Sequence, residues 1–141
     1  MKETVLKNNN KLPYTLHDMR ISKIIIEEND INLIFENGYV ENKEPFKQIE
    51  GSVIIKEVDY DFCSIHLLSR NGKYGKFVGR KIGFKEFIEK FKKYSFEVVD
   101  ELYGFNQVQY SGFLMLSNAK DFIEYSMNFY YTGDLIYLTK E

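Results

Sequence analysis

Residues 95–131 decide the fold, and they read SFEVVDELYGFNQVQYSGFLMLSNAKDFIEYSMNFYY. Apolar and polar side chains alternate through most of this stretch, and a period of two is typical of strands with one buried face. Turn-forming residues divide the stretch into three runs, at 95–103, 107–117 and 121–131. The sequence therefore predicts three consecutive antiparallel strands here.

The register of these strands follows from keeping the apolar side chains on one face, because a slip by one residue would mix the two faces. Pairing the second and third strands with Tyr110 opposite Phe129 separates the faces. A three-residue turn at 104–106 then places Asp100 opposite Tyr110, as a lone carboxylate on an apolar surface that Gly112 leaves open. We expect Asp100, Tyr110 and Phe129 to form either a ligand site or a structural polar pair.

Short runs of strand-like composition continue before and after this stretch. They lie at 20–28, 31–36, 49–58, 61–69, 74–82 and 135–139, with a weaker one around Tyr39 and Val40. Asn37-Gly38 and Asn71-Gly72 are typical two-residue hairpin turns, because Asn and Gly both tolerate a positive φ. The 12 Phe, 11 Tyr and 14 Ile, against a single Ala, also favour sheet over helix.

One segment has the period of a helix. Phe84, Phe87, Ile88 and Phe91 fall on one helical face, and charged residues fill the other face. We predict an amphipathic helix at about 83–94 whose aromatic stripe packs on the sheet.

These features predict a mainly β domain of the α+β class, an antiparallel meander that forms a curved sheet with one amphipathic helix. The sequence leaves open a partly closed barrel or a two-sheet sandwich. The polar residues 1–11 are expected to be a flexible lead-in, and 12–141 a single β-rich domain. A chain of 141 residues with 44% hydrophobic and 28% charged residues fits a globular protein, and its apolar runs are too short to span a membrane.

The sequence offers little support for catalysis, cofactors or metal binding. A single cysteine, Cys63, excludes an internal disulfide and a multi-cysteine zinc site. Cys63 and His66 fall on opposite faces of one predicted strand; the hairpin at 71–72 would place Cys63 beside Arg80, yet a quiet buried thiol is favoured. His17 and Asp18 are neighbours that rarely face each other in extended chain, and we expect them to form a turn or the entry to a strand. We predict no cofactor and no metal.

The charge is distributed unevenly, since residues 70–93 carry +7 in a chain whose net charge is −2. One interpretation is an electrostatic docking face for an acidic partner, and the other is an ordinary solvated lysine surface. The residues of the basic block are Lys73, Lys76, Arg80, Lys81, Lys85, Lys90, Lys92 and Lys93. Because Lys outnumbers Arg, the block disfavours nucleic acid as the partner.

The abundance of Lys, Asn, Ile, Tyr and Phe indicates a low-GC bacterial genome, and a free thiol without a signal sequence indicates the cytoplasm. We expect a non-catalytic protein-interaction module of a bacterial cytoplasm, of the inhibitor or immunity type, whose partner has an acidic face. The alternatives are a small-ligand-binding β-barrel and an enzyme that uses Asp100 with neighbouring Tyr residues.

Overall fold

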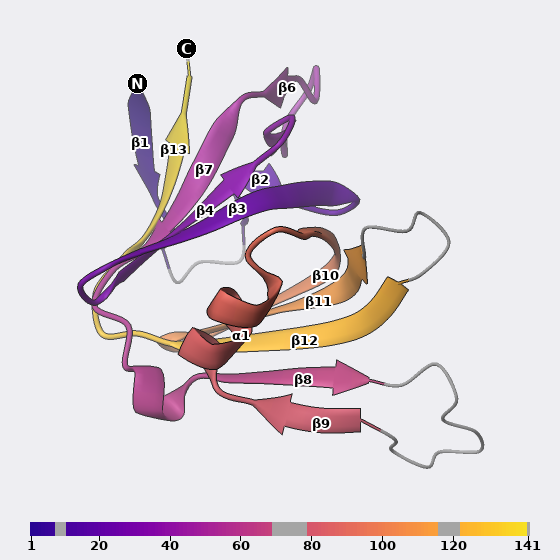
Figure 1. Ribbon diagram of the computed structural model, residues 1–141. Coiled ribbons are helices and arrows are strands. Elements are labelled where there is room, and N and C mark those ends of the chain that lie inside the picture. Colours follow the sequence, from indigo (N-terminus) through magenta and orange to yellow (C-terminus); the bar gives the residue numbers. More distant parts are fainter. Residues whose placement is uncertain (8–10, 69–78, 116–121, 141) are drawn as a thin grey trace.

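The computed structural model describes residues 1–7, 11–68, 79–115 and 122–140 (Figure 1). Within these ranges the chain is mainly β, as predicted, with antiparallel strands and one α-helix. The strands are β1 (Lys2–Val5), β2 (Tyr14–Thr15), β3 (Met19–Glu27), β4 (Asp30–Phe35), β5 (Tyr39–Glu41), β6 (Gln48–Ile49), β7 (Gly51–Ile55), β8 (Ser64–Leu68), β9 (Gly79–Ile82), β10 (Ser95–Gly104), β11 (Gln107–Met115), β12 (Phe122–Tyr130) and β13 (Leu135–Thr139). The helices are a 3₁₀-helix, η1 (Tyr60–Phe62), and α1 (Phe84–Phe91).

Ten of the described strands form one large sheet in the order β1-β13-β7-β4-β3-β10-β11-β12-β8-β9, and β2, β5 and β6 form a small second sheet. The large sheet bends sharply, so that the arm from β1 to β3 rises away from the arm from β10 to β9 (Figure 1). Its described strands end at two edges, β1 and β9. The expectation of a curved antiparallel sheet is confirmed, and the barrel alternative is wrong because the sheet is not closed.

Helix α1 packs against the inner side of the second arm through its aromatic stripe. Phe84, Phe87 and Phe91 are all buried. The Phe87 ring lies 5.4 Å from the Phe96 ring of β10, and the Phe84 ring lies 5.1 Å from the Phe129 ring of β12. These rings belong to one hydrophobic core that contains residues of both arms, as expected of a single domain.

The register of β11 against β12 differs from the predicted one by two residues. Tyr110 lies opposite Met127, and Phe129 lies opposite Val108. Because side chains alternate with a period of two, a two-residue shift leaves every residue on its predicted face. The buried face of both strands was therefore predicted correctly, whereas the cross-strand pairs were wrong.

A β-bulge in β10 changes the predicted pairing with β11. The predicted register holds at Val98, which lies opposite Gly112. The register then shifts between Val98 and Asp100, because β10 contains one extra residue there. As a result Asp100 lies beside Ser111, and Glu101 takes the place opposite Tyr110 that was expected for Asp100.

Gly112 is required where β10 and β11 meet near this bulge. A Cβ atom at Gly112 would lie 2.0 Å from the carbonyl oxygen of Glu97. The same carbonyl accepts a hydrogen bond of 2.9 Å from the Tyr125 hydroxyl. A side chain at Gly112 would therefore push the two strands apart.

The two arms of the large sheet are joined by a short seam between β3 and β10, here called the β3–β10 seam. It consists of three residue pairs, which run from Phe96 opposite Ile21 to Val98 opposite Met19. The Val98 carbonyl also accepts a 2.7 Å hydrogen bond from the backbone N–H of Asp18.

Two local features of the first arm differ from the prediction. Residues 2–5, expected within a flexible lead-in, form β1 and pair with β13. The turn at Asn37-Gly38, with φ of 71° at Gly38, leads from β4 into the small sheet and does not close a hairpin with β4, because β5 pairs with β2 and β6. The predicted turn at 71–72 lies outside the described residues.

Replacing Phe87 by alanine is expected to lower the free energy of unfolding by about 3–5 kcal/mol, because the ring is completely buried and its loss leaves a cavity. Chemical denaturation measures this change. Phe62→Ala is the control, since the Phe62 side chain is 71% exposed and its removal should leave stability nearly unchanged. Equal stability of Phe87→Ala and wild type would contradict the packing described for α1.

Candidate functional site

Asp100 does not form the predicted pair with Tyr110. The β10 bulge turns Asp100 onto the solvent-exposed outer face of the sheet, beside Ser111. Tyr110 and Phe129 do meet in the core, with ring centroids 6.2 Å apart. The polar pair expected at Asp100 is therefore wrong, and the bulge, which shifts the strand by one residue, is the reason.

Glu101 is the carboxylate that enters the interior. One of its oxygens accepts a 2.7 Å hydrogen bond from the Leu16 backbone N–H, and the other accepts a 2.6 Å bond from the Tyr103 hydroxyl. The Tyr103 hydroxyl in turn accepts a 3.2 Å bond from the Tyr137 hydroxyl of the first arm. Burial raises the pKa of Glu101 above its usual range, although the bonds from Tyr103 and Leu16 act in the opposite direction.

Of the tyrosines around Glu101, Tyr110 and Tyr137 are completely buried and Tyr103 is partly buried. Burial raises the pKa of Tyr103, Tyr110 and Tyr137 well above the usual value, so these hydroxyls stay protonated at neutral pH. The neutral hydroxyls of Tyr103 and Tyr137 can each donate and accept hydrogen bonds. This arrangement ties the two arms together through Glu101.

His17 and Asp18 form the turn that was expected. Contrary to the sequence argument, the side chains face each other, with 3.3 Å between His17 Nε2 and Asp18 Oδ2. Asp18 has a φ of 63°, and this left-handed conformation replaces the extended one assumed from the sequence. His17 Nδ1 lies 2.6 Å from the Val99 carbonyl oxygen, and this contact, followed by Asp18, raises the pKa of His17.

Cys63 is a buried free thiol, and the burial agrees with the interpretation favoured from the sequence. It precedes β8, and Arg80 lies opposite Leu67, so the predicted pairing of Cys63 with Arg80 is wrong. The Cys63 thiol is 3.2 Å from the Asp59 carbonyl oxygen, and burial raises the pKa of the thiol. A raised pKa reduces the fraction of reactive thiolate.

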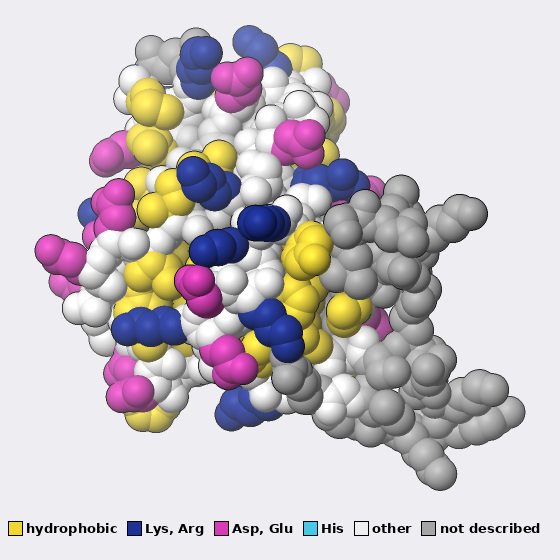
Figure 2. Space-filling model, viewed as in Figure 1, with side chains coloured by type: hydrophobic (Ala, Val, Ile, Leu, Met, Phe, Trp, Pro, Cys, Tyr) yellow, Lys and Arg dark blue, Asp and Glu magenta, His cyan; other side chains and the backbone are white. Residues whose placement is uncertain are grey.

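The helical part of the basic block is exposed on one surface. Lys85, Lys90, Lys92 and Lys93 lie on the outward face of α1 and the turn that follows it. Figure 2 shows Lys and Arg side chains gathered in the middle of this view, with acidic side chains between them. Lys92 forms an ion pair on this surface, and its Nζ lies 3.1 Å from a Glu89 carboxylate oxygen.

The rest of the basic block does not join this surface within the described residues. Lys81 lies opposite His66, and strand alternation puts it on the side of the sheet away from the buried Ile82 and α1. Only the backbone of Arg80 is described, and Lys73 and Lys76 lie outside the described residues.

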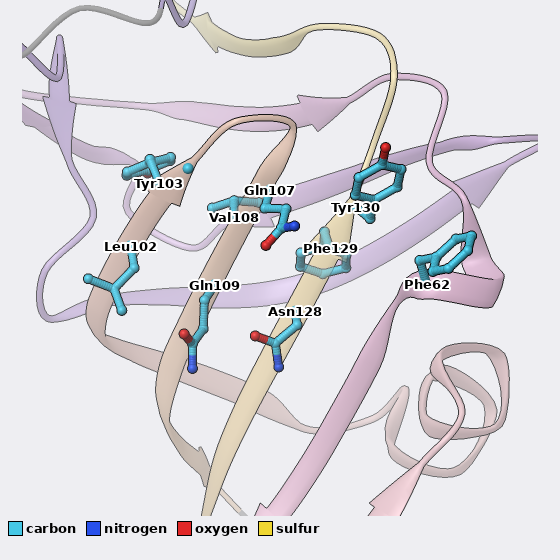
Figure 3. Close-up of a pocket in the computed structure, with 10 residues that line it drawn as sticks. Phe62, Leu102, Tyr103, Gln107, Val108, Gln109, Asn128, Phe129 and Tyr130 are labelled. Atoms are coloured by element: carbon cyan, nitrogen blue, oxygen red, sulfur yellow. The ribbon is translucent and has the colours of Figure 1, made fainter.

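A groove of about 570 Å³ lies on the outer face of the second arm (Figure 3). Its floor consists of two rows of residues that face one another across β10, β11 and β12. The first row is Leu102, Gln109 and Asn128, and the second row is Gly104, Gln107 and Tyr130.

An aromatic wall borders this groove. Phe62 projects from η1, and its ring centroid lies 5.7 Å from that of Tyr130. The Phe62 side chain is 71% exposed, and Leu102 on the opposite side of the groove is 64% exposed. Figure 3 shows Leu102, Gln109 and Asn128 pointing to the same side from three neighbouring strands.

The groove could not be recognised from charged or catalytic residues, because its polar side chains are neutral amides and phenols. A signal was present in the outer positions of the predicted strands. Gln107, Gln109, Ser111, Ser126 and Asn128 are polar but uncharged, in a chain in which 28% of the residues are charged.

Nothing matches this chain in comparisons with protein-family models, with curated proteins and with solved structures. Within the described ranges, no three His, Cys, Asp or Glu side chains are grouped as a metal site would require. Among the helices in those ranges, none combines the length and apolar character needed to cross a membrane.

The free energy of unfolding is expected to rise as the pH falls from about 7 to about 5. The pKa values of Glu101 and His17 are raised in the folded protein, so the folded state binds their protons more tightly than the unfolded chain does. The resulting stabilisation is complete below the unfolded pKa values and is lost as the pH rises through the folded ones.

Urea denaturation of wild type and Glu101→Gln at several pH values measures the contribution of Glu101. The variant should gain less stability on acidification, because it has no carboxylate to protonate. His17→Ala is the companion variant that removes only the histidine contribution. Parallel pH profiles for wild type and Glu101→Gln would show that the pKa of Glu101 is not raised by folding.

Proposed function

We propose that this protein is a non-catalytic protein-interaction module that binds the acidic face of a protein partner through the outward surface of α1. The observation that carries the proposal is the set of four exposed lysines on α1 and the turn that follows it, Lys85, Lys90, Lys92 and Lys93. An inhibitor or immunity-type protein in a bacterial cytoplasm is the role that we infer for such a module.

The packing of α1 supports this role. The aromatic stripe of the helix is buried against the sheet, so the helix offers its charged face alone to a partner. Phe84 and Phe87 fix the helix through contacts with Phe129 and Phe96. A preorganised display of charge speeds association with an oppositely charged surface and depends on ionic strength.

The charge on this surface is positive on balance. Four lysines outnumber the two acidic residues of the helix, Glu86 and Glu89, in a chain whose net charge is −2. Among the described residues, Lys92 is the one of these four lysines that forms an ion pair with an acidic residue of the helix, at 3.1 Å from Glu89. The surface is therefore basic on an otherwise acidic protein.

Replacing Lys90 and Lys93 together by glutamate should slow association with the partner about tenfold or more and flatten its salt dependence. The melting temperature should change little, because exposed charges contribute at most about 1 kcal/mol each. The partner is first captured from the host with the wild-type protein, and association rates are then measured by surface plasmon resonance at several salt concentrations.

The matched control is Lys43→Glu with Lys47→Glu, which changes the net charge equally at two exposed lysines between β5 and β6 of the small sheet. This control should retain most of the wild-type association rate. If the helix variant and the control bind alike at every salt concentration, the α1 surface is not the docking site.

A further inference from the structure

We propose that the groove on the outer face of β10, β11 and β12 is a binding site for a neutral oligosaccharide. This site goes beyond the proposed function. The groove is independent of the α1 lysine surface, because α1 packs on the opposite face of the same strands. The groove has a volume of about 570 Å³, which lies in the range of small-ligand sites.

The lining of the groove indicates an uncharged ligand. Among the described residues that border it, none carries a charge. The polar groups are instead the side-chain amides of Gln107, Gln109 and Asn128 and the phenol of Tyr130. A charged ligand would find no counter-charge here, since the neighbouring Asp100 belongs to the next row of the sheet, beside Ser111.

Two of the amides, those of Gln109 and Asn128, contact a serine beside them on the same face of the sheet. Gln109 Nε2 donates a 2.8 Å hydrogen bond to Ser126 Oγ, and Asn128 Nδ2 lies 3.5 Å from the same oxygen. Each amide nitrogen carries two hydrogens, so each of these two amides still offers one N–H donor and its oxygen acceptor to a ligand. Groups that both donate and accept match this set, and hydroxyls are such groups.

The walls supply apolar surface beside these polar groups. Phe62 and Tyr130 form an aromatic wall, and Leu102 borders the other side. Gly104 leaves the second row open, because a Cβ atom there would meet nothing within 4 Å. A sugar ring has hydroxyls at its edge and C–H groups on its faces, so it satisfies the amide floor and the aromatic wall together.

Two other kinds of ligand fit the groove less well. A hydrocarbon chain would leave the amides without partners, which costs binding energy. A peptide cannot add as a strand on the groove floor, because β11 is already paired with β10 on one side and β12 on the other. A proline-rich peptide has few N–H donors for the amide oxygens.

The test is NMR of the ¹⁵N-labelled full chain titrated with maltotetraose, cellotetraose and chitotetraose, each to about 10 mM, since an open groove should give a Kd near 1 mM. The readout is the side-chain NH₂ signals of Gln107, Gln109 and Asn128. At least one saccharide should shift these signals, while the NH₂ signals of Asn42 and Gln48, which lie in the small sheet or directly beside it, stay in place.

Gly104→Leu should fill the groove and weaken this binding about tenfold or more. Gly83→Leu is the matched control, because a Cβ at Gly83 also meets nothing within 4 Å and the residue lies at the start of α1. Phe62→Ala, at a 71% exposed side chain, provides a second variant that keeps the fold and should also weaken binding.

The proposal is overturned if none of the three saccharides shifts the groove amides. It is also overturned if the shifts persist unchanged in both Gly104→Leu and Phe62→Ala, or if an octaproline peptide shifts the amides and the saccharides do not. Because the α1 lysine variants leave the groove intact, failure of the saccharide titration says nothing against the protein partner, and the reverse is also true.

Discussion

The β3–β10 seam is the constraint on which the rest of the structure depends. It joins the two arms of the sheet through three residue pairs, whereas β10 and β11 share nine. Hydrogen bonds outside the ladder reinforce it, from the backbone N–H of Asp18 to Val98 and from that of Leu16 to Glu101. The sheet bends at this short seam, and tyrosines of both arms meet on its inner side, as Tyr137 and Tyr103 do.

Features that depend on neighbouring residues could be predicted from the sequence, and features that depend on contacts between distant strands could not. The helix could be predicted because its signal is local: Phe84, Phe87 and Phe91 recur with the helical period, and all three are buried. The faces of β11 and β12 could also be predicted, because alternation determines them. The register could not, because a two-residue shift leaves the faces unchanged and therefore has no signature in the alternation.

The bulge after Val98 is a feature that alternation alone could not locate. Val98 is the last residue of β10 that pairs with β3, and its carbonyl also binds Asp18, which lies far away in the sequence. The extra residue therefore occurs where the pairing between β10 and β3 ends. The bulge changes the candidate site, because it displaces the strand by one residue. Glu101 then points toward the core in place of Asp100.

The same strands separate two surfaces of different chemistry. On the inner side, Phe129 and Phe96 pack against α1, so the interior is filled by the core and the lysines project from the far side of the helix. On the outer side, the groove presents amides and aromatic rings without charge. A helix layer packs about 10 Å from a sheet, which keeps ligands on the two surfaces out of contact. Occupation of one surface therefore leaves the other free, and the rigid sheet between them allows each to be varied without disturbing its neighbour.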